Sequence, residues 1–515
     1  MKRLLCALLC AALLLPLVGC GGAKLNSFTW FVDAIPTNLD PQIAAESADV
    51  IACTNLYSGL FRLDADSHLQ NAGCESYTVS SDGLTYTFQL KSGLTYRSLK
   101  GAQSAYTVTA ADYVFAFQRV FTADTASPYA DTFAGIRNAQ AVLSGQSEPS
   151  ALGVTASGAD TLIIQLSAAD DHFLQKLTLP GAMPCCEAFF NSTAGTYGLN
   201  KDSVLASGSF YLYNWTESGL FLRRDTTDAS INSIRLVQNT TNSTMSNEEL
   251  VKSEKCTAAL DNGSGDTTLT SIPYTDTTWC LVFNGGSVFA NASLRQALAA
   301  DVPGAGLPAD DTLYSAATGI LPSGCEVDSY DYRALAGDIL APSGDGAAAY
   351  AQALNEVGVD ALKGISVLVP ESVDSAYVQA LNGQWQKDYS LFFNIESADE
   401  ETFAKRIADG DFTLALVPLQ LTQQDPLTLL TQFDGGWSDY YNASYHQLLT
   451  QAQTASGEAK VEALAQAERL LTEDCAAVPL YAQNRRLLVA SGISGLRFDP
   501  YGPILDLTDA TMKSS

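Results

Sequence analysis

The chain has 515 residues, of which 47% are hydrophobic and only 16% are charged. This composition excludes a generally disordered chain and allows a large core, and at about 150 residues per domain the length predicts about three domains. There are 28 basic and 56 acidic residues, and the formal charge of −28 argues against nucleic acid or an anionic membrane surface as the working partner.

Residues 1–19 are typical of a secretory signal peptide. Lys2 and Arg3 form a basic start, and an apolar run follows from Leu4 to Val18. The run is too short for a spanning helix but suits a signal peptide. It ends in Leu17-Val18-Gly19-Cys20, which resembles a bacterial lipobox. That resemblance implies cleavage before Cys20, a lipid on this cysteine and a tether over residues 20–27. The alternative is an ordinary signal peptide followed by an incidental cysteine.

The following residues predict strands and helices in alternation. Phe28 to Phe31 favours a strand, a turn follows at residues 35–41, and a helical stretch runs from Val50 to Phe61. Apolar and polar side chains then alternate over residues 84–90, which predicts a half-buried strand after the turn at Asp82-Gly83.

Thr109 and Asp112 resemble a helix capping box, and Val114, Phe117 and Phe121 recur behind it at helical spacing. The elements predicted further on are paired strands at 152–155 and 161–166, a hairpin of 209–215 with 219–223, a strand at 279–284, a helix capped by Ser293, a loop at 341–347, a strand at 364–369 and a helix at 460–471. Strands and helices alternate throughout, which indicates an α/β fold.

Eight cysteines follow Cys20, and the sequence leaves their pairing open. An even number outside the cytoplasm can form disulfides, but adjacent Cys185-Cys186 are poorly placed to bridge each other. Cys280 lies in an apolar run, which favours buried free thiols. The three histidines (His68, His172 and His446) share no close spacing, so we expect no metal site and no cofactor.

No nucleophile elbow, phosphate-binding loop, zinc-protease motif or dinucleotide fingerprint occurs in the sequence. Acidic clusters at Asp170-Asp171, Asp310-Asp311 and residues 399–401 could hide a glycosidase pair, because the required separation is spatial. Surface acids and helix caps explain these clusters better, so we expect no enzyme.

Eleven segments, spread over nearly the whole mature chain, together carry a family resemblance. They are Thr37–Pro41, Leu56–Phe61, Asp82–Gly93, Val108–Arg119, Ser127–Ala130, Leu152–Val154, Phe289–Leu298, Gly410–Phe412, Asp425–Leu430, Ala465–Glu468 and Val478–Tyr481. In this order they resemble solute-binding protein family 5, the oligopeptide- and dipeptide-binding lipoproteins of ABC importers.

The resemblance implies a two-lobed, periplasmic-binding-protein-like α/β fold (type II, cluster C) with a hinge and an interlobe ligand cleft. It divides the chain into three domains. These are a split first-lobe domain of 28–65, 189–273 and 486–515, an additional domain of 66–188 packed on it, and a second lobe of 274–485. Crossings near residues 274 and 485 would form the hinge, and closure around ligand would be a hinge motion.

The resemblance also implies a ligand site. Peptides in this family are bound largely through their backbone, in roomy and hydrated pockets. By position, the ligand-binding residues would be Ala45, Glu46 and Ser47 from the first lobe, Tyr129 facing the cleft, and Leu419, Gln420, Thr422, Gln423, Gln424 and Asp425 from the second lobe.

Two departures from the family pattern bear on the ligand. Many members hold the α-ammonium of the peptide with an Asp, and Thr422 stands at that position here. A hydroxyl cannot neutralise a buried ammonium, so either Asp425 or Glu46 substitutes for it, or the ligand lacks a free amine there. The family's frequent disulfide at this segment is also missing, since Thr277 and Gln420 stand at the matching places.

The sequence therefore predicts a monomeric lipoprotein, anchored by lipid alone on the extracytoplasmic face of the cell membrane. It would capture peptides or another small solute and deliver them to the permease and ATPase subunits of an ABC importer. A signal receptor or surface interaction lipoprotein on the same fold, and an importer of a non-peptide solute, are the alternatives.

Overall fold

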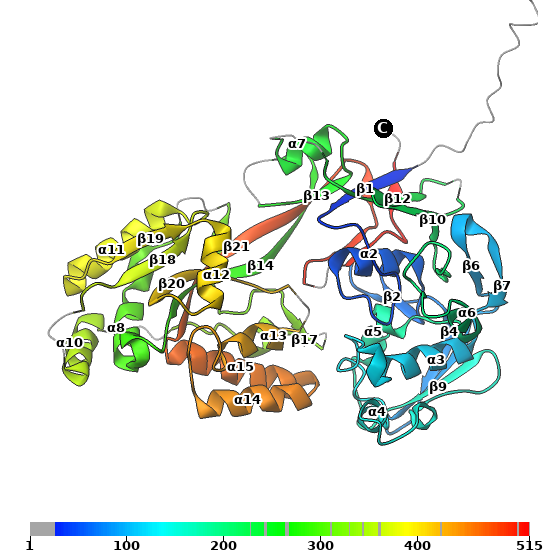
Figure 1. Ribbon diagram of the computed structural model, residues 1–515, viewed down its shortest axis with the longest axis horizontal. Coiled ribbons are helices and arrows are strands. Elements are labelled where there is room, and N and C mark those ends of the chain that lie inside the picture. The colour runs from blue at the N-terminus through cyan, green and yellow to red at the C-terminus, as the bar shows by residue number, and fades with distance from the viewer. Residues whose placement is uncertain are drawn as a thin grey trace, which may run out of the picture.

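The computed structural model describes residues 26–226, 228–240, 245–262, 267–308, 312–328, 330–341, 345–358, 362–422, 425–501 and 504–513. It shows an α/β protein in which two bodies of sheet and helix are joined by two long strands, β14 (Thr270–Phe283) and β21 (Ala477–Val489) (Figure 1). We call the body that holds β1 to β12 the N-terminal body, and the one that holds β15 to β20 the central body. Within the described ranges no helix is both long and apolar enough to cross a membrane. The predicted signal peptide and Cys20 lie outside them.

A four-stranded sheet of order β1-β12-β11-β10 forms the upper part of the N-terminal body. β1 (Ser27–Val32) confirms the strand predicted at its position and runs parallel to β12 (Ser233–Gln238). The antiparallel hairpin of β10 (Tyr211–Thr216) and β11 (Gly219–Arg223) is also confirmed. Segments far apart in the sequence therefore share one sheet.

The prediction of a helix continuing to Phe61 is wrong, because α2 covers only Ser47–Leu56. Tyr57 adopts an extended conformation, and the Leu56 carbonyl accepts the N–H of Gly208 (2.8 Å). In a continued helix this carbonyl would accept the N–H of the residue four positions later, but here a distant residue occupies it. Phe61 instead begins strand β2 (Phe61–Leu63).

A second, antiparallel sheet of order β4-β5-β9-β8 lies lower in the N-terminal body. The predicted alternation is confirmed in β5 (Thr85–Leu90), whose Tyr86, Phe88 and Leu90 are buried. Helix α3 (Ala110–Val120) contacts this sheet, and the Asp112 carboxylate at its start accepts the Thr109 N–H (2.8 Å). The other strands of the sheet are β4 (Cys74–Val79), β8 (Val154–Ala156) and β9 (Thr161–Gln165).

Short elements complete the N-terminal body. They are β3 (Leu69–Asn71), β6 (Thr95–Arg97), β7 (Gln103–Thr107), α4 (Ala139–Leu143), α5 (Phe173–Lys176), α6 (Glu187–Ser192) and α7 (Asn247–Lys252), with the C-terminal strands β22 (Ile493–Ser494), β23 (Arg497–Asp499), β24 (Ile504–Asp506) and β25 (Thr511–Met512). The C-terminal segment docks on α2, because the Asn55 side chain donates to the Leu505 carbonyl (2.7 Å) and accepts the Leu507 N–H (2.9 Å).

The largest sheet has the order β13-β21-β14-β20-β18-β19 and is mixed. β14 runs antiparallel to both β21 and β20, whereas β18 runs parallel to β19 and β20. The remaining strands are β13 (Ala258–Asp261), β15 (Tyr314–Ala316), β18 (Ser366–Pro370), β19 (Asn394–Ala398) and β20 (Leu414–Gln420). The strand predicted at residues 279–284 is one end of the longer β14.

Both faces of this sheet are covered, since alternate residues of a strand point to opposite sides. Trp279 and Leu281 of β14 pack in one core with α8 (Ala292–Ala300), α10 (Gly346–Val357) and α11 (Ser375–Tyr389). Cys280 and Val282 pack in the other core, whose helices are α9 (Tyr332–Ala336), α12 (Glu400–Ala408), α13 (Leu427–Leu430), α14 (Ala443–Thr454) and α15 (Gly457–Glu473). The predicted amphipathic helix at 460–471 is confirmed as part of α15.

Two boundary predictions in the central body are wrong. The cap of α8 is Asn291, whose side chain accepts the Leu294 N–H (3.0 Å), while the Ser293 hydroxyl donates to Glu356 (2.9 Å). The loop predicted at 341–347 ends earlier, because the Asp345 carboxylate caps α10 and the helix begins at Gly346. In both cases a side chain next to the expected position supplies the cap.

All eight cysteines after Cys20 are free and buried, which agrees with the alternative that the sequence favours. Burial raises the pKa of the Cys256 thiol to about 11 and is the largest influence raising that of Cys185 to about 12. These thiols act as small apolar core residues.

Candidate functional site

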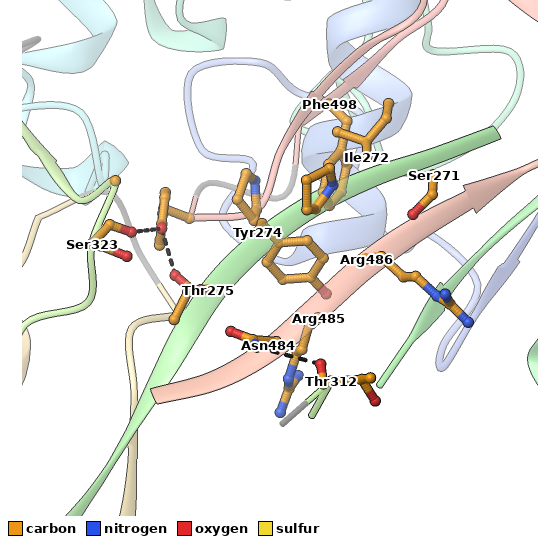
Figure 2. A pocket seen from close by; sticks show the side chains of 14 residues that line it. Ser271, Ile272, Tyr274, Thr275, Thr312, Ser323, Asn484, Arg485, Arg486 and Phe498 are labelled. Carbon is orange, nitrogen blue, oxygen red and sulfur yellow. Dashed lines mark hydrogen bonds between the residues drawn. The ribbon is translucent and has the colours of Figure 1, made fainter. Parts of the chain in front are cut away.

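A pocket of about 740 Å³ opens beside the paired strands β14 and β21, where they pass between the two bodies (Figure 2). Its wall combines these strands with a loop of the central body and with the C-terminal segment. The lining residues are Ser271, Ile272, Pro273, Tyr274, Thr275, Thr312, Ser323, Gly324, Asn484, Arg485, Arg486, Phe498, Pro500 and Tyr501. A concave, partly apolar site between two bodies is a preferred place for a small ligand.

An irregularity in β14 lies beside this pocket. Thr275 pairs with Asn484 and Thr277 pairs with Gln483, so Asp276 is an extra residue without a partner on β21. Such bulges break the strict alternation of side chains and re-aim individual residues. The bulge therefore changes the direction of the Asp276 carboxylate, which lies between strands that are otherwise rich in apolar residues.

Asp276 is only 4% exposed, and its charge is compensated from three strands. Arg485 of β21 places Nε 3.2 Å from Oδ1, the Thr277 hydroxyl donates to Oδ1 (2.8 Å), and the Gln420 amide of β20 donates to Oδ2 (3.0 Å). A buried carboxylate persists only when it is paired and hydrogen-bonded in this way. The Asp276 carbonyl also accepts the Leu421 N–H (2.8 Å), which fixes the end of β20.

Tyr274 forms an aromatic wall next to this ion pair. Its ring meets Phe498 of the C-terminal segment edge to face, with centroids 5.4 Å apart. Burial raises the pKa of the Tyr274 phenol to about 12, and the Asp276 charge adds to this, while Arg485 opposes the rise. Arg485 therefore interacts with both a carboxylate and a neutral phenol.

Tyr501 connects the C-terminal segment with the central body at the edge of the pocket. Its hydroxyl lies 2.5 Å from the Thr275 carbonyl and 2.9 Å from the Ser323 carbonyl, and it can donate to one of them at a time. Gly324 has φ +88°, and a Cβ there would lie 3.1 Å from the Tyr501 hydroxyl. Both its backbone conformation and its space therefore favour glycine.

The two bodies also contact each other away from β14 and β21. Lys176 of α5 lies 2.9 Å from the Asp170 carboxylate and 3.6 Å from the Asp328 carboxylate of the central body. The His172 ring lies 4.0 Å from the Tyr330 ring, centroid to centroid. Tyr330 belongs to β17 (Tyr330–Asp331), which pairs with β16 (Glu326–Val327) and lies beside α5 in Figure 1.

The predicted first-lobe residues lie at the start of α2. Ala45, Glu46 and Ser47 are exposed, and Glu46 is the N-cap residue. Tyr129 is half-buried, and its hydroxyl donates to the Ala44 carbonyl (2.8 Å). Tyr129 thus holds the backbone directly before the three exposed residues, and its role towards a ligand stays a prediction.

The predicted second-lobe residues follow the end of β20. Leu419 is buried in the core, whereas Thr422 is exposed. Gln420 pairs with Thr277 in the register of β20 and β14, so the two positions that the resemblance matches to the family's frequent disulfide lie opposite each other here. Asp425 accepts a salt bridge from Lys460 (3.0 Å). Gln423 and Gln424 lie outside the described residues.

The sequence did not single out Asp276, Tyr274, Arg485 or Tyr501 as site residues. A usable signal was present, because Arg485-Arg486 interrupts the apolar run of 477–489 and Asp276 lies just before the apolar run that begins at Trp279. Charged residues inside strand segments are costly unless they are paired or functional. Their partners, however, come from distant parts of the chain.

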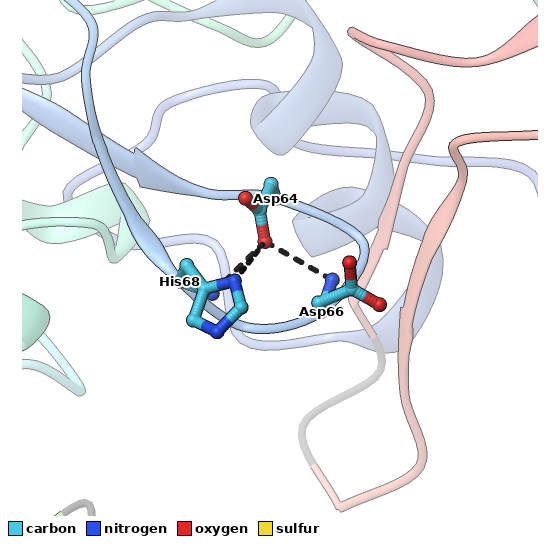
Figure 3. Close-up of side chains that lie close together, drawn as sticks. All are labelled: Asp64, Asp66 and His68. Carbon is cyan, nitrogen blue, oxygen red and sulfur yellow. Dashed lines mark hydrogen bonds and ion pairs between the residues drawn. The ribbon is translucent and has the colours of Figure 1, made fainter.

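One group of potential metal ligands occurs in the described part of the chain, at the turn between β2 and β3 (Figure 3). It consists of Asp64, Asp66 and His68. An Asp64 oxygen already accepts the backbone N–H groups of Asp66 (3.0 Å) and His68 (2.9 Å). These bonds explain the cluster as a tight turn, and we assign it no ligand.

Two bodies joined by paired strands, with a pocket beside those strands, define a two-lobed binding protein. Sequence comparison identifies the family, since a family model described as "Bacterial extracellular solute-binding proteins, family 5 Middle" matches residues 68–441. The chain therefore belongs to this family. Its members bind solutes for ABC import outside the cytoplasm and are not enzymes.

Individual relatives are distant. The chain is 24% identical to the dipeptide-binding protein DppE of Bacillus subtilis over 91% of this chain and 89% of that protein, and 22% identical to the oligopeptide-binding protein OppA of the same species over 87% and 85%. It is 29% identical to the probable deoxycholate-binding periplasmic protein YgiS of Escherichia coli, but this match spans only 35% of the chain and 33% of that protein.

Solved structures agree on the fold. The structure of Listeria monocytogenes OppA bound to peptide aligns with a TM-score of 0.66 at 21% identity, and covers 96% of this chain and 100% of that one. The substrate-binding domain of an oligopeptide ABC transporter from Bacillus anthracis aligns with a TM-score of 0.65 at 24% identity, over 96% and 99%. The expected fold class is confirmed.

Proposed function

We propose that this protein is a lipid-anchored, peptide-binding subunit of an ABC importer that captures its ligand between the two bodies and delivers it to a permease. The observation that carries the proposal is the pocket beside β14 and β21, because it is walled by both bodies and by the strands that join them. A ligand held there would favour one relative arrangement of the bodies, and closure would follow from contacts available only in that arrangement.

The proposed domain division follows the same arrangement. Separate apolar cores support it: one core unites Phe28, Leu236 and Leu505, a second lies around Phe88 and Phe117, and two more cover the faces of the largest sheet. We propose a split first domain of 28–65, 189–273 and 486–515, a second domain of 66–188, and a second lobe of 274–485.

The lipid anchor is proposed on sequence grounds. Two acyl chains on Cys20 give stable anchoring where a single chain does not. Replacing Cys20 by Ala should move the protein from the membrane fraction to the soluble fraction and remove the lipid from the N-terminal peptide in mass spectrometry. A protein that stays in the membrane fraction after Cys20→Ala would contradict the anchor.

Native mass spectrometry of the purified protein, followed by calorimetric titration, tests the ligand class. We expect short peptides to co-purify and to rebind after removal, together with a smaller radius of gyration in solution scattering. The relative named as probable deoxycholate-binding gives the second candidate, a non-peptide solute. Binding of deoxycholate without binding of any peptide would replace the peptide assignment.

A further inference from the structure

The Arg485 guanidinium has more donors than the protein supplies with acceptors. A guanidinium carries five N–H donors. Asp276 is the one carboxylate paired with Arg485 among the described residues, and its Nε contact at 3.2 Å is an ion pair without an aligned hydrogen bond. Thr277 and Gln420 also donate to the Asp276 carboxylate, so about two of its four acceptor sites are already used, and those that remain are fewer than the five donors of Arg485.

The Tyr274 phenol oxygen is a further acceptor for Arg485, but the neighbouring polar groups do not complete the set of five. The Asn484 side chain accepts the Ser315 hydroxyl (2.9 Å) and donates to the Thr312 carbonyl (3.3 Å), so it is already occupied. The Arg485 side chain keeps 24% of its surface exposed, and Figure 2 shows it beside Asn484 and Thr312 in the pocket wall. A partly desolvated cation with unfilled donors is suited to accept an anion from a ligand.

The other side chains of the wall restrict what the anion can be attached to. Ile272, Phe498 and Tyr501 line the same pocket as Arg485. The Tyr274 phenol is neutral at physiological pH, as an ordinary phenol is, and burial raises its pKa further, to about 12. A carboxylate matches the planar donor fork of arginine, and an apolar or aromatic group next to it would fill the remaining wall.

We infer that Arg485 bridges Asp276 and a carboxylate of the bound ligand, so that the hinge pocket selects acidic ligands whose carboxylate adjoins an apolar or aromatic group. This inference rests on the proposed function, namely ligand capture at the hinge. The carboxylate can be the C-terminus of a peptide or an acidic side chain. Arg485 is then the residue that determines specificity.

The test compares matched ligands by calorimetry on the purified full chain. The peptides are Val-Leu-Phe as free acid, its C-terminal amide, and the amide of Glu-Leu-Phe; deoxycholate and its methyl ester form a non-peptide pair. The variants are Arg485→Gln, the double variant Asp276→Asn with Arg485→Gln, and Arg235→Gln. The single variant leaves the buried Asp276 charge unpaired, whereas the double variant removes both charges and keeps the test open where the single variant fails to fold. Arg235 is exposed on β12, so its variant removes one positive charge elsewhere.

We expect the wild type and Arg235→Gln to bind the free acid at least tenfold more tightly than the amide, and both Arg485 variants to bind the two within twofold. Equal affinity of the wild type for the Glu-Leu-Phe amide and for the Val-Leu-Phe free acid would also support the inference and assign the carboxylate to a side chain. Binding of deoxycholate alone, with loss on esterification and in the Arg485 variants, would support it while the peptide assignment fails. Equal affinity of the wild type for each acid and its neutral partner would overturn it, as would a preference that survives in the double variant.

Discussion

The Arg119 guanidinium at the end of α3 holds the Asp40 carboxylate of the N-terminal turn, with Nη1 and Oδ1 3.0 Å apart. Both side chains are nearly inaccessible, at 9% and 3% exposure. The same guanidinium donates to the Gln42 side chain (2.7 Å) and lies over the Phe190 ring, 4.3 Å from its centroid. This pair therefore joins the segment before α2 to the helix of the lower sheet.

Replacing Asp40 by Asn should lower the free energy of unfolding by about 3–5 kcal/mol, because removing one partner leaves a buried charge without compensation. Urea unfolding followed by tryptophan fluorescence measures this loss. Asp33→Asn is the matched control, since Asp33 is exposed near the same turn. A loss below about 1 kcal/mol for Asp40→Asn would show that the pair is no stronger than a surface salt bridge.

This pair illustrates what could not be predicted from the sequence. Asp40 and Arg119 both lie in segments that carry the family resemblance, yet nothing local indicates that they meet across 79 positions. Asp276 and Arg485 are still further apart, and a bulge rather than a regular alternation aims the carboxylate. Long-range pairing of charges depends on how finished elements pack, which a local pattern does not contain.

Local patterns were sufficient for most elements. The alternation in β5, the capping pair Thr109–Asp112 and the helical spacing in α15 depend only on neighbours within a few residues, and all three are confirmed. The end of α2 was missed because the Gly208 N–H, a partner far along the chain, takes the Leu56 carbonyl. The residues of the hinge pocket were missed because their partners, too, lie far along the chain.

The contact between Lys176 and Asp328 should influence how far the two bodies open. Asp328→Asn removes the ion pair with Lys176, one of the contacts between the two bodies, and leaves the Lys176–Asp170 pair intact. A partly exposed ion pair is worth about 1 kcal/mol, so the ratio of open to closed protein should rise about fivefold. Solution scattering without ligand should report a larger radius of gyration for Asp328→Asn.

Glu248→Gln is the control for this measurement, because its ion pair with Lys252 lies within the single helix α7. Its scattering should match that of the wild type. If Asp328→Asn scatters like the wild type at low ionic strength, where salt screens the pair least, the contact does not restrain opening.

The eight buried thiols should be unreactive in the folded protein. Burial raises the pKa of Cys74 to about 11 and that of Cys475 to about 12, so little thiolate exists at pH 8 and no reagent has direct access. Iodoacetamide at pH 8 should modify none of the eight in the folded protein. In denaturant without reductant it should modify all eight, as intact mass can measure. Fewer than eight modifications in denaturant would indicate disulfides and contradict the free thiols of the structure.

The ligand should bind without needing a free α-amine. The position that usually carries an acid is Thr422, Asp425 is paired with Lys460, and Asp276 is paired with Arg485. A charged hydrogen bond from an ammonium to a partly buried carboxylate would contribute about 1.5–3 kcal/mol, or about 10- to 100-fold in affinity. Without such a partner, N-acetylation of a bound peptide should change its dissociation constant less than about threefold in calorimetry.

A loss of tenfold or more in affinity on N-acetylation would contradict this prediction and indicate that an acid binds the amine. Glu46 is the candidate for that acid, because it is exposed and, unlike Asp425 and Asp276, has no salt bridge among the described residues. Glu46→Gln would then have to abolish the preference, and Glu187→Gln is the control.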